Sequence, residues 1–315
     1  MSRSLSRSAP LVLVGLLSPL VLAACGGSSD DGGGAASSTT TAAAAAFPVS
    51  VTGTNGKLTI DEQPESIVSL SATATEMLFA IDAGPQVKAV DSTSNYPTDA
   101  PKTDLSAFTP NAEAIAKYEP DLVVLSDDMN GIVAALGKLH IPTLQLGAAA
   151  TLDDSYEQLA TLGDATGHAD DAAKVATDMK DRIDAAVKSV GDSAEGMSVY
   201  HELDPTYYSV GSSTFIGSVY KLFGLENIAD KAADAAGGYP QLSAEFVVGA
   251  APDLIVLADT VCCQQTAETL AKRPAFDTVP AVKDGRVLEA SDDVASRWGP
   301  RIADFAESVA ETVKG

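Results

Sequence analysis

The chain has 315 residues, of which 45% are hydrophobic, and its formal net charge is −23. A chain of this length can form about two domains, each with a core of its own. The acidic balance and the lack of basic clusters exclude nucleic acid as a partner, because phosphate binding depends on grouped Lys and Arg. The same balance disfavours a strongly anionic ligand.

The first residues have the pattern of a secretion signal. Arg3 and Arg7 precede an apolar run, Leu11 to Leu22, that is too short to span a membrane. Small residues then lead into Cys25, which resembles the lipobox of bacterial lipoproteins. The resemblance implies a lipoprotein signal peptide over residues 1–24 and lipidation of the cysteine. An ordinary signal peptide with an incidental cysteine is the alternative.

A polar segment follows this start. Residues 25–46 are rich in Gly, Ser, Thr, Ala and Asp, a composition that buries too little apolar area to fold. We expect a disordered tether with a mean reach of about 25 Å. Two or more acyl chains give a stable anchor. The expected location is therefore extracytoplasmic, with the folded body held at the cell membrane by its lipid alone.

The folded body is expected to begin with a hairpin. Residues 47–60 alternate around Asn55-Gly56, a pattern typical of two strands joined by a type I′ turn. We place the N-terminal lobe over residues 47–166. Its other predicted elements are strands at 67–70, 87–90 and 142–146, and helices at 75–81, 131–139 and 152–165.

One stretch of fifteen residues occurs twice. Ala112–Ser126 and Ala244–Ala258 share a glutamate, a Pro-Asp pair and an apolar run, at an offset of 245 − 113 = 132 residues. Each copy predicts a short helix that ends before the proline, then a strand covered on both faces. The repeat predicts two similar α/β lobes. The alternative is chance, because Pro-Asp before an apolar run is common in α/β proteins.

A long amphipathic helix is predicted between the two copies. From Asp170 to Val190 the apolar residues fall on one helical stripe and the other face is charged. About 20 residues of helix extend roughly 30 Å, enough to connect two lobes. We place this bridge in residues 167–192 and the C-terminal lobe in 193–315. The lobe's predicted elements are strands at 199–203 and 287–290 and helices at 214–223, 265–271 and 299–313.

Several stretches together resemble the extracytoplasmic solute-binding proteins of bacterial ABC importers for vitamin B12 and ferric siderophores. They are residues 67–80, the two repeat copies, 239–245 and 296–301. The resemblance implies an α/β fold of two Rossmann-like lobes bridged by a single long helix, with the ligand in a cleft between them. It implies a monomeric binding protein that needs no cofactor, is not an enzyme, and delivers its solute to a permease and its ATPase.

The ligand is expected to be a bulky chelate. Residues 200–205 and 211–217 resemble the B12 binders more closely, which implies a cobalamin-like corrinoid. The sequence has only one tryptophan, where several would be expected in a B12 cleft, so a ferric hydroxamate siderophore or haem is the alternative. A secreted hydrolase is the enzyme-class alternative, although the sequence has no Gly-x-Ser-x-Gly elbow, Walker loop or dinucleotide fingerprint.

Candidate ligand-binding residues lie near the predicted carboxyl ends of the strands, where open α/β sheets bind ligands. Aromatic rings offer flat contacts there and polar groups fix orientation, although any one tyrosine could instead be a packing residue. Four candidates, Tyr96, Tyr239, Asp293 and Arg297, match binding positions of the B12 subgroup by motif. The full set is Ser71, Thr73, Tyr96, Phe108, Asp127, Tyr207, Tyr239, Asp259, Asp293, Arg297 and Trp298.

The two repeat glutamates have a separate predicted role. Glu113 and Glu245 match the family glutamates that pair with arginines of the permease, and two well-separated carboxylates on a rigid body can set its orientation during docking. The alternative is that each simply stabilises a helix N-terminus through the macrodipole.

The remaining cysteines and the histidines raise the questions of a disulfide and a metal site. Outside the cell Cys262 and Cys263 are expected to oxidise, and adjacent cysteines either close a strained ring or stay free. We expect no metal site, because His140, His168 and His201 are widely spaced.

Overall fold

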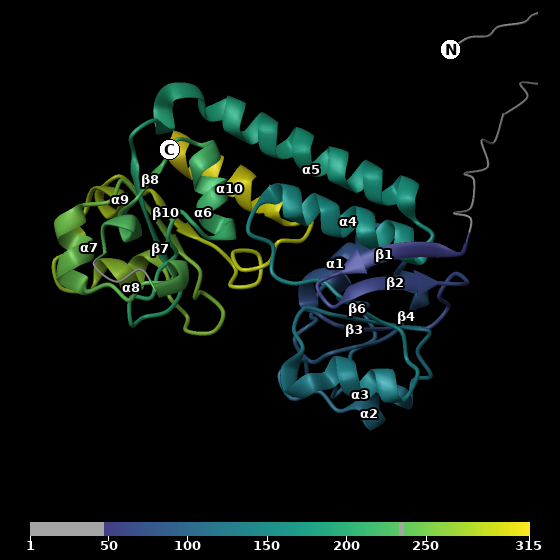
Figure 1. The fold of residues 1–315 in the computed structure, drawn as a ribbon. Coiled ribbons are helices and arrows are strands. Elements are labelled where there is room, and N and C mark those ends of the chain that lie inside the picture. The colour runs from purple at the N-terminus through teal and green to yellow at the C-terminus, as the bar shows by residue number, and fades with distance from the viewer. Residues whose placement is uncertain (1–46, 233–235) are drawn as a thin grey trace, which may run out of the picture. The chain divides into compact units, whose positions relative to one another are not determined.

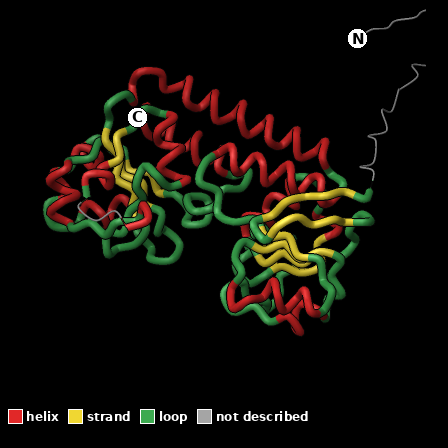
Figure 2. The backbone as a smooth tube through the Cα atoms, viewed as in Figure 1, coloured by secondary structure: helices red, strands yellow, loops and turns green. Residues whose placement is uncertain are grey.

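Two parallel β-sheets form the framework of this computed structural model, which describes residues 47–232 and 236–315 (Figures 1 and 2). The predicted signal peptide, the predicted lipidation site at Cys25 and the predicted tether lie outside the described residues. In the part of the chain that is described, no helix has both the length and the apolar character needed to cross a membrane.

The N-terminal sheet has the strand order β4-β3-β5-β6. Its two central strands are buried at every position, which explains why their sequences show no polar alternation. The strands are β3 (Ile67–Leu70), β4 (Val87–Val90), β5 (Leu122–Leu125) and β6 (Thr143–Gln145). The helices are α1 (Ala72–Ala80), α2 (Ala112–Ala116), α3 (Ile132–Lys138) and α4 (Leu152–Thr166).

The C-terminal sheet repeats this topology. Its order is β10-β9-β7-β8, so β7 and β9 are central as β3 and β5 are in the first sheet. The strands are β7 (Ser198–Glu202), β8 (Glu226–Asn227), β9 (Leu254–Leu257) and β10 (Val287–Glu289). The helices are α6 (Phe215–Leu222), α7 (Ala244–Ala250), α8 (Ala267–Ala271), α9 (Pro280–Lys283) and α10 (Ile302–Lys314). The predicted pair of similar α/β lobes is thereby confirmed.

The predicted long helix is α5 (Ala169–Val190), of 22 residues. It packs along α4 and α10, as Figure 1 shows. Arg182 on α5 forms ion pairs with Asp304 and Glu307 on α10. The apolar stripes of these helices join one hydrophobic core that includes residues of both lobes, and a separate smaller core lies in each lobe. The exact residue limits assigned to the lobes stay a prediction.

The hairpin forms as expected, but its turn is different. Strands β1 (Val49–Gly53) and β2 (Gly56–Ile60) are antiparallel, and Gly53 pairs with Gly56. The turn residues are therefore Thr54 and Asn55, and neither has the positive φ that a type I′ turn requires. The prediction of the turn type was wrong. Tertiary bonds explain it, because the Asn55 amide donates to the Thr143 carbonyl (2.8 Å) and accepts from the Gln145 N–H (3.1 Å).

Candidate functional site

Each sheet has a point at which the strand order reverses. In the N-terminal sheet it lies between β3 and β5, and in the C-terminal sheet between β7 and β9. Open α/β sheets bind ligands just outside the carboxyl ends of the strands at such points. The residues that follow these four strands are therefore the first place to look for a site, and most of the predicted residues lie on loops next to them.

The N-terminal reversal point has a cavity of about 330 Å³. Three predicted residues, Ser71, Phe108 and Asp127, line it together with Met129. The Ser71 hydroxyl also caps α1 by accepting the Ala74 N–H at 3.2 Å. Phe108 is 66% exposed, so its ring is open to a ligand. One further serine and one threonine line the cavity, and its other walls are apolar. The remaining lining residues are Leu70, Ala72, Thr93, Ala107, Pro110, Leu125, Ser126 and Ile132.

A partly buried polar group joins the two lobes, and we call Glu76, Asn95, Asp293, Arg297 and Arg301 the inter-lobe ion cluster. Glu76 on α1 is 3% exposed and accepts from Arg297 Nη1 at 2.8 Å and Arg301 Nε at 2.9 Å. Arg297 also donates to the Asn95 side chain at 2.9 Å and to Asp293. Asn95 donates to Asp293 at 2.6 Å. Two carboxylates therefore balance two guanidinium groups.

This cluster accounts for two of the predicted ligand-binding residues. Asp293 and Arg297 both bond to residues of the opposite lobe, and the Arg297 side chain donates as well to the Thr93 carbonyl at 3.1 Å. Trp298 similarly bonds to α4, where its indole N–H donates to Gln158 at 2.8 Å. These contacts hold the segment against the N-terminal lobe. A direct role of these side chains in ligand binding stays a prediction.

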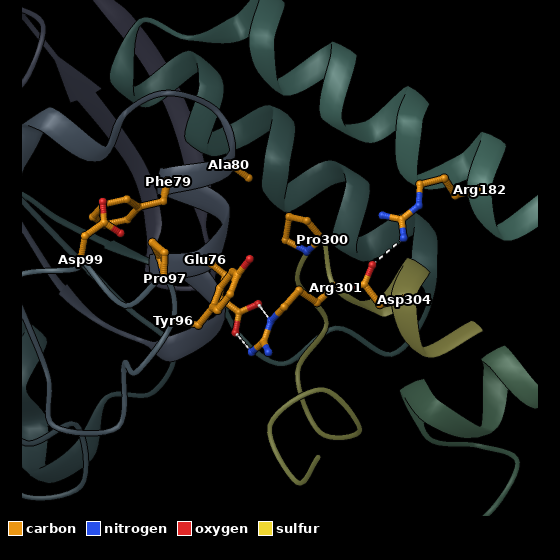
Figure 3. Close-up of a pocket in the computed structure, with 10 residues that line it drawn as sticks. All are labelled: Glu76, Phe79, Ala80, Tyr96, Pro97, Asp99, Arg182, Pro300, Arg301 and Asp304. Carbon is orange, nitrogen blue, oxygen red and sulfur yellow. Dashed lines mark hydrogen bonds and ion pairs between the residues drawn. The ribbon is translucent and has the colours of Figure 1, made fainter. Parts of the chain in front are cut away.

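Tyr96 lies at the edge of the cluster, where Figure 3 shows it beside the Glu76–Arg301 ion pair. The Arg301 guanidinium is 4.2 Å from the centre of its ring, within cation–π range. A cavity of about 460 Å³ borders both residues and extends between the lobes to Arg182 on α5. Tyr96 is 43% exposed. Thr73, in contrast, is buried within α1 and is not among the residues that line this cavity.

The C-terminal reversal point has a different chemistry. Glu202 and Asp259, at the ends of β7 and β9, are both fully buried. Arg273 forms a bidentate ion pair with Glu202, at 2.7 and 2.6 Å, and the Tyr200 hydroxyl donates to the same carboxylate at 3.0 Å. Among the described residues no donor reaches either oxygen of Asp259. Burial, and secondarily the charge of Glu202, raise the pKa of Asp259 to about 7.

The two other predicted tyrosines lie on neighbouring segments of this lobe. Tyr207 stacks on Phe276 and lies under the Arg273 guanidinium, 5.5 Å from its ring centre. Tyr239 is 50% exposed. Its segment pairs with the residues after β7, as the bond from the Ser209 N–H to the Pro240 carbonyl (2.9 Å) shows. The structure thus brings Tyr207 and Asp259 to Arg273 and leaves the Tyr239 ring exposed.

Sequence reasoning did not select Glu76, Glu202, Arg273 or Arg301 as site residues. A signal for Glu202 was available, because it lies inside the strand predicted at 199–203, and a carboxylate that is buried in a sheet needs a partner. Nothing local points to Arg273, which lies 71 residues further along the chain.

Large hydrophobic side chains are exposed mainly at one end of the sheets, namely the side on which the carboxyl ends of the strands lie; we call this side the carboxyl edge. Six of the nine in the described part of the chain lie on loops next to the carboxyl ends of the strands, and the other three lie at helix ends toward the opposite edge. The six are Tyr96, Phe108, Met129, Tyr208, Tyr239 and Val261, and the three are Tyr118, Leu139 and Leu222.

The loop after β9 contains the two cysteines. Cys262 and Cys263 are joined as a vicinal disulfide. The Asp292 carboxylate accepts the N–H groups of Val261 and Cys262, each at 2.9 Å. The loop is therefore fixed to the segment that also carries Asp293.

The histidines form no metal site among the residues that the structure describes, which contain no cluster of three or more potential ligands. His201 is fully buried, and its Nδ1 is 2.7 Å from the Tyr220 hydroxyl. Burial lowers the pKa of His201 to about 3.

The two repeat glutamates occupy equivalent surface positions. Glu113 is in the first turn of α2 and Glu245 in the first turn of α7, and both are exposed. Side chains of Asn111 and Ser243 cap these helices. Within residues 47–232 and 236–315, neither glutamate has an ion-pair partner. Both carboxylates are thus available to a partner protein.

Comparison with known proteins agrees with this architecture. Residues 67–294 match the family model described as periplasmic binding protein. An uncharacterised ABC transporter substrate-binding lipoprotein of Bacillus subtilis is 30% identical over 279 residues, covering 85% of this chain and 86% of that protein. A cobalamin-binding protein of Halobacterium salinarum is 31% identical over 270 residues, covering 82% and 72%.

Solved structures show the same fold. The vitamin B12-binding protein of Vibrio cholerae has a TM-score of 0.64 at 23% identity, covering 80% of this chain and 97% of that one. A periplasmic haem-binding protein from Roseiflexus has a TM-score of 0.66 at 22% identity, covering 79% and 97%. At these identities the likeness concerns the fold alone.

Proposed function

We propose, since this chain belongs to the periplasmic binding protein family, that it is the substrate-binding component of an ABC importer and that its ligand is a corrinoid. The family consists of extracytoplasmic solute-binding proteins rather than enzymes. The lipoprotein from Bacillus subtilis supports the expected anchor at Cys25. The proposed cargo is captured outside the cell and passed to a permease driven by an ATPase.

The exposed hydrophobic side chains at the carboxyl edge of the sheets carry this proposal. Tyr96 and Phe108 belong to the N-terminal lobe, Tyr239 to the C-terminal lobe, and all three rings are at least 43% exposed. Exposed rings concentrated at one edge suit a large ligand with apolar faces, which they would cover on binding. A corrinoid has such faces, and its polar amide rim would meet the serines, threonines and carboxylates of the same loops.

The arginines favour a ligand without strong negative charge. Every arginine in the described part of the chain forms an ion pair with a carboxylate: Arg182, Arg273, Arg286, Arg297 and Arg301. A catecholate siderophore or the propionates of haem would have to compete with these carboxylates. The name of the relative from Halobacterium salinarum supports cobalamin further. A ferric hydroxamate, which lacks the excess charge of a catecholate, is the second candidate.

Delivery is proposed to use the repeat glutamates. Glu113 and Glu245 are exposed at equivalent helix N-termini, one in each lobe. Carboxylates so placed can pair with arginines of the permease and fix the orientation of both lobes at once.

The direct test is thermal unfolding of the full-length lipoprotein in detergent with cyanocobalamin, a ferric hydroxamate or haem. A ligand at 100 times its dissociation constant stabilises the native state by about 2.7 kcal/mol, which raises the melting temperature by roughly 5 °C. A shift with cyanocobalamin alone supports the proposal. A shift with only the hydroxamate or only haem would contradict the corrinoid assignment, and no shift with any of the three would contradict all these ligand classes.

Tyrosine variants then test the site. We expect Tyr96→Ala and Tyr239→Ala each to weaken cyanocobalamin binding about tenfold, because each removes a ring that covers the ligand. Tyr118→Ala is the matched control, since Tyr118 is 37% exposed at the opposite edge. Calorimetric titration measures the three affinities. Equal affinities in all three variants and the wild type would place the ligand elsewhere.

A further inference from the structure

The loop after β9 occupies the position of a cavity-lining loop in the other lobe. The 132-residue offset of the repeat places Val261 opposite Met129, since 261 − 132 = 129, and places Cys262-Cys263 opposite Asn130-Gly131. Met129 lines the cavity at the N-terminal reversal point and is 38% exposed. Val261 is 71% exposed. Both lobes thus present an aliphatic side chain just beyond their central strand.

The two loops achieve their shapes by different means. Asn130 and Gly131 adopt positive φ angles of 57° and 71°, a conformation that Asn and Gly tolerate best. Neither Cys262 nor Cys263 has a positive φ. Their loop is held instead by the disulfide and by hydrogen bonds, including those from two backbone N–H groups to Asp292.

The anchor of this loop is also part of the connection between the lobes. Asp292 is followed directly by Asp293, which bonds to Asn95 of the N-terminal lobe at 2.6 Å and to Arg297. The exposed tip is therefore fixed, through two consecutive aspartates, to the inter-lobe ion cluster. Hydrogen bonds and an ion pair therefore fix the position of the tip relative to the N-terminal lobe.

We propose that Val261 and the Cys262–Cys263 disulfide form a ligand-contact surface of the C-terminal lobe, and that the disulfide sets the affinity by fixing its shape. This inference rests on the proposed function. An exposed valine beside two polarisable sulfur atoms suits an apolar ligand face. Pre-ordering the tip removes an entropic cost of binding that a flexible loop would carry. The ligand class is a large, partly apolar and weakly charged chelate.

Reduction removes the restraint in a defined way. A dithiol reductant transfers two electrons and two protons to the sulfur–sulfur bond, which breaks to give thiols at Cys262 and Cys263, while the reductant becomes a cyclic disulfide. The hydrogen bonds to Asp292 involve backbone N–H groups, so reduction leaves those groups chemically unchanged. The expected consequence is a mobile tip with weaker binding.

Calorimetric titration of the full-length lipoprotein with cyanocobalamin tests this surface. We expect Val261→Ser to weaken binding about fivefold, the effect of losing roughly one buried aliphatic contact. We expect the double variant Cys262→Ser/Cys263→Ser to weaken it about threefold to tenfold through loss of order. Leu139→Ser is the matched control, because Leu139 is 45% exposed at the opposite edge of the sheet, and its affinity should stay within about twofold of wild type.

Reduction of the disulfide with dithiothreitol is the second experiment. It should weaken binding by the wild type to the level of the double variant and leave the double variant unchanged. Intact mass should show that the untreated wild type lacks two hydrogens and regains them on reduction. Two titratable thiols in the untreated native protein would overturn the role of the disulfide.

The outcomes separate this inference from the proposed function. If the wild type binds cyanocobalamin and both Val261→Ser and the double variant bind it equally well, the contact surface is wrong and the proposed function stands. If hydrogen exchange at residues 260–264 does not slow when cyanocobalamin is added, the contact is also wrong. If the wild type binds none of the three ligands, the proposed function fails and this inference fails with it.

Discussion

The repeated strands β5 and β9 each directly follow one aspartate, and a second aspartate lies two residues beyond each strand. The two aspartates at the entrances have similar environments, whereas the two at the exits do not. At the entrance of β5, Asp121 accepts the N–H groups of Glu65 and Ser66 at 2.9 and 3.0 Å. At the entrance of β9, Asp253 accepts the N–H and the hydroxyl of Ser198, both at 2.9 Å. Each carboxylate ties the start of its strand to the start of the neighbouring strand.

The aspartates at the exits differ. Asp127 is exposed beside the N-terminal cavity, whereas Asp259 is fully buried next to Glu202. The neighbouring strands differ as well. Leu70 pairs with the end of β5, and Glu202 pairs with the end of β9, at the same 132-residue offset. The N-terminal lobe thus has a leucine where the C-terminal lobe has Glu202, which forms a buried acidic pair with Asp259. The repeated sequence determines the backbone conformation, whereas the side chains on the neighbouring strand influence the charge of the exit aspartate.

The largest effect is expected at Glu113 and Glu245, which occupy the same position of the repeat in the two lobes. Glu113→Lys combined with Glu245→Lys should abolish uptake of labelled cobalamin by cells, because the two carboxylates that we propose orient docking are replaced by cations, which repel the permease arginines. The affinity of the purified protein for its ligand should stay within about twofold, since neither residue lines the cavities described above.

The control variant has the same net charge as the Glu113→Lys/Glu245→Lys variant. Glu62→Lys combined with Glu195→Lys reverses two other exposed glutamates, and uptake should continue. If the repeat variant also supports normal uptake, docking does not depend on Glu113 and Glu245.

The next largest effect should separate the two exit aspartates. The folded-state pKa of Asp259 is raised from 3.8 to about 7. Its ionisation therefore destabilises the fold progressively as the pH rises from about 4 to about 7, and the penalty is constant above that. Asp259→Asn should thus gain stability relative to wild type with rising pH, by roughly 2–4 kcal/mol at pH 8.

Denaturant unfolding at pH 4 and pH 8 measures this difference. Asp127→Asn is the matched control and should change stability by less than about 0.5 kcal/mol at either pH, because Asp127 is exposed. A stability difference between Asp259→Asn and wild type that does not depend on pH would contradict the raised pKa.

The smallest effect should be shared by the two entrance aspartates. Asp121→Ala and Asp253→Ala each remove a carboxylate that accepts two hydrogen bonds, so each should destabilise the protein by about 1–3 kcal/mol. The two losses should agree within about 1 kcal/mol, as denaturant unfolding at neutral pH would show. A much larger loss in one lobe would mean that the equivalent bonds do not contribute equally.

Features that depend on local pattern were predictable. The unbroken apolar runs of β5 and β9 indicated parallel central strands, and the charged and apolar faces of α5 indicated one long helix. The offset of the repeat correctly predicted two lobes with matching topology. These inferences succeed because burial on both faces of a strand, or along one stripe of a helix, produces a recognisable residue pattern within that single element.

Features that depend on distant partners were not predictable. The hairpin turn follows the Asn55 bonds to β6, some 90 residues away, rather than the Asn-Gly signal. Arg297 was selected for the ligand, but in the structure its donors reach Glu76, Asn95 and Asp293. The state of Asp259 depends on Glu202 and Arg273, and no spacing along the chain brings these three residues together before the fold is known.

The inter-lobe ion cluster differs from Glu113 and Glu245, the proposed docking residues, in its access to dissolved salt. Glu76 is 3% exposed and Arg297 is 9% exposed, so mobile ions scarcely enter between them. Exposed carboxylates are screened strongly, because the Debye length falls from about 10 Å at 0.1 M to about 3 Å at 1 M. Raising the ionic strength should therefore weaken delivery to the permease while leaving the geometry of the two lobes, and capture of the ligand, unchanged.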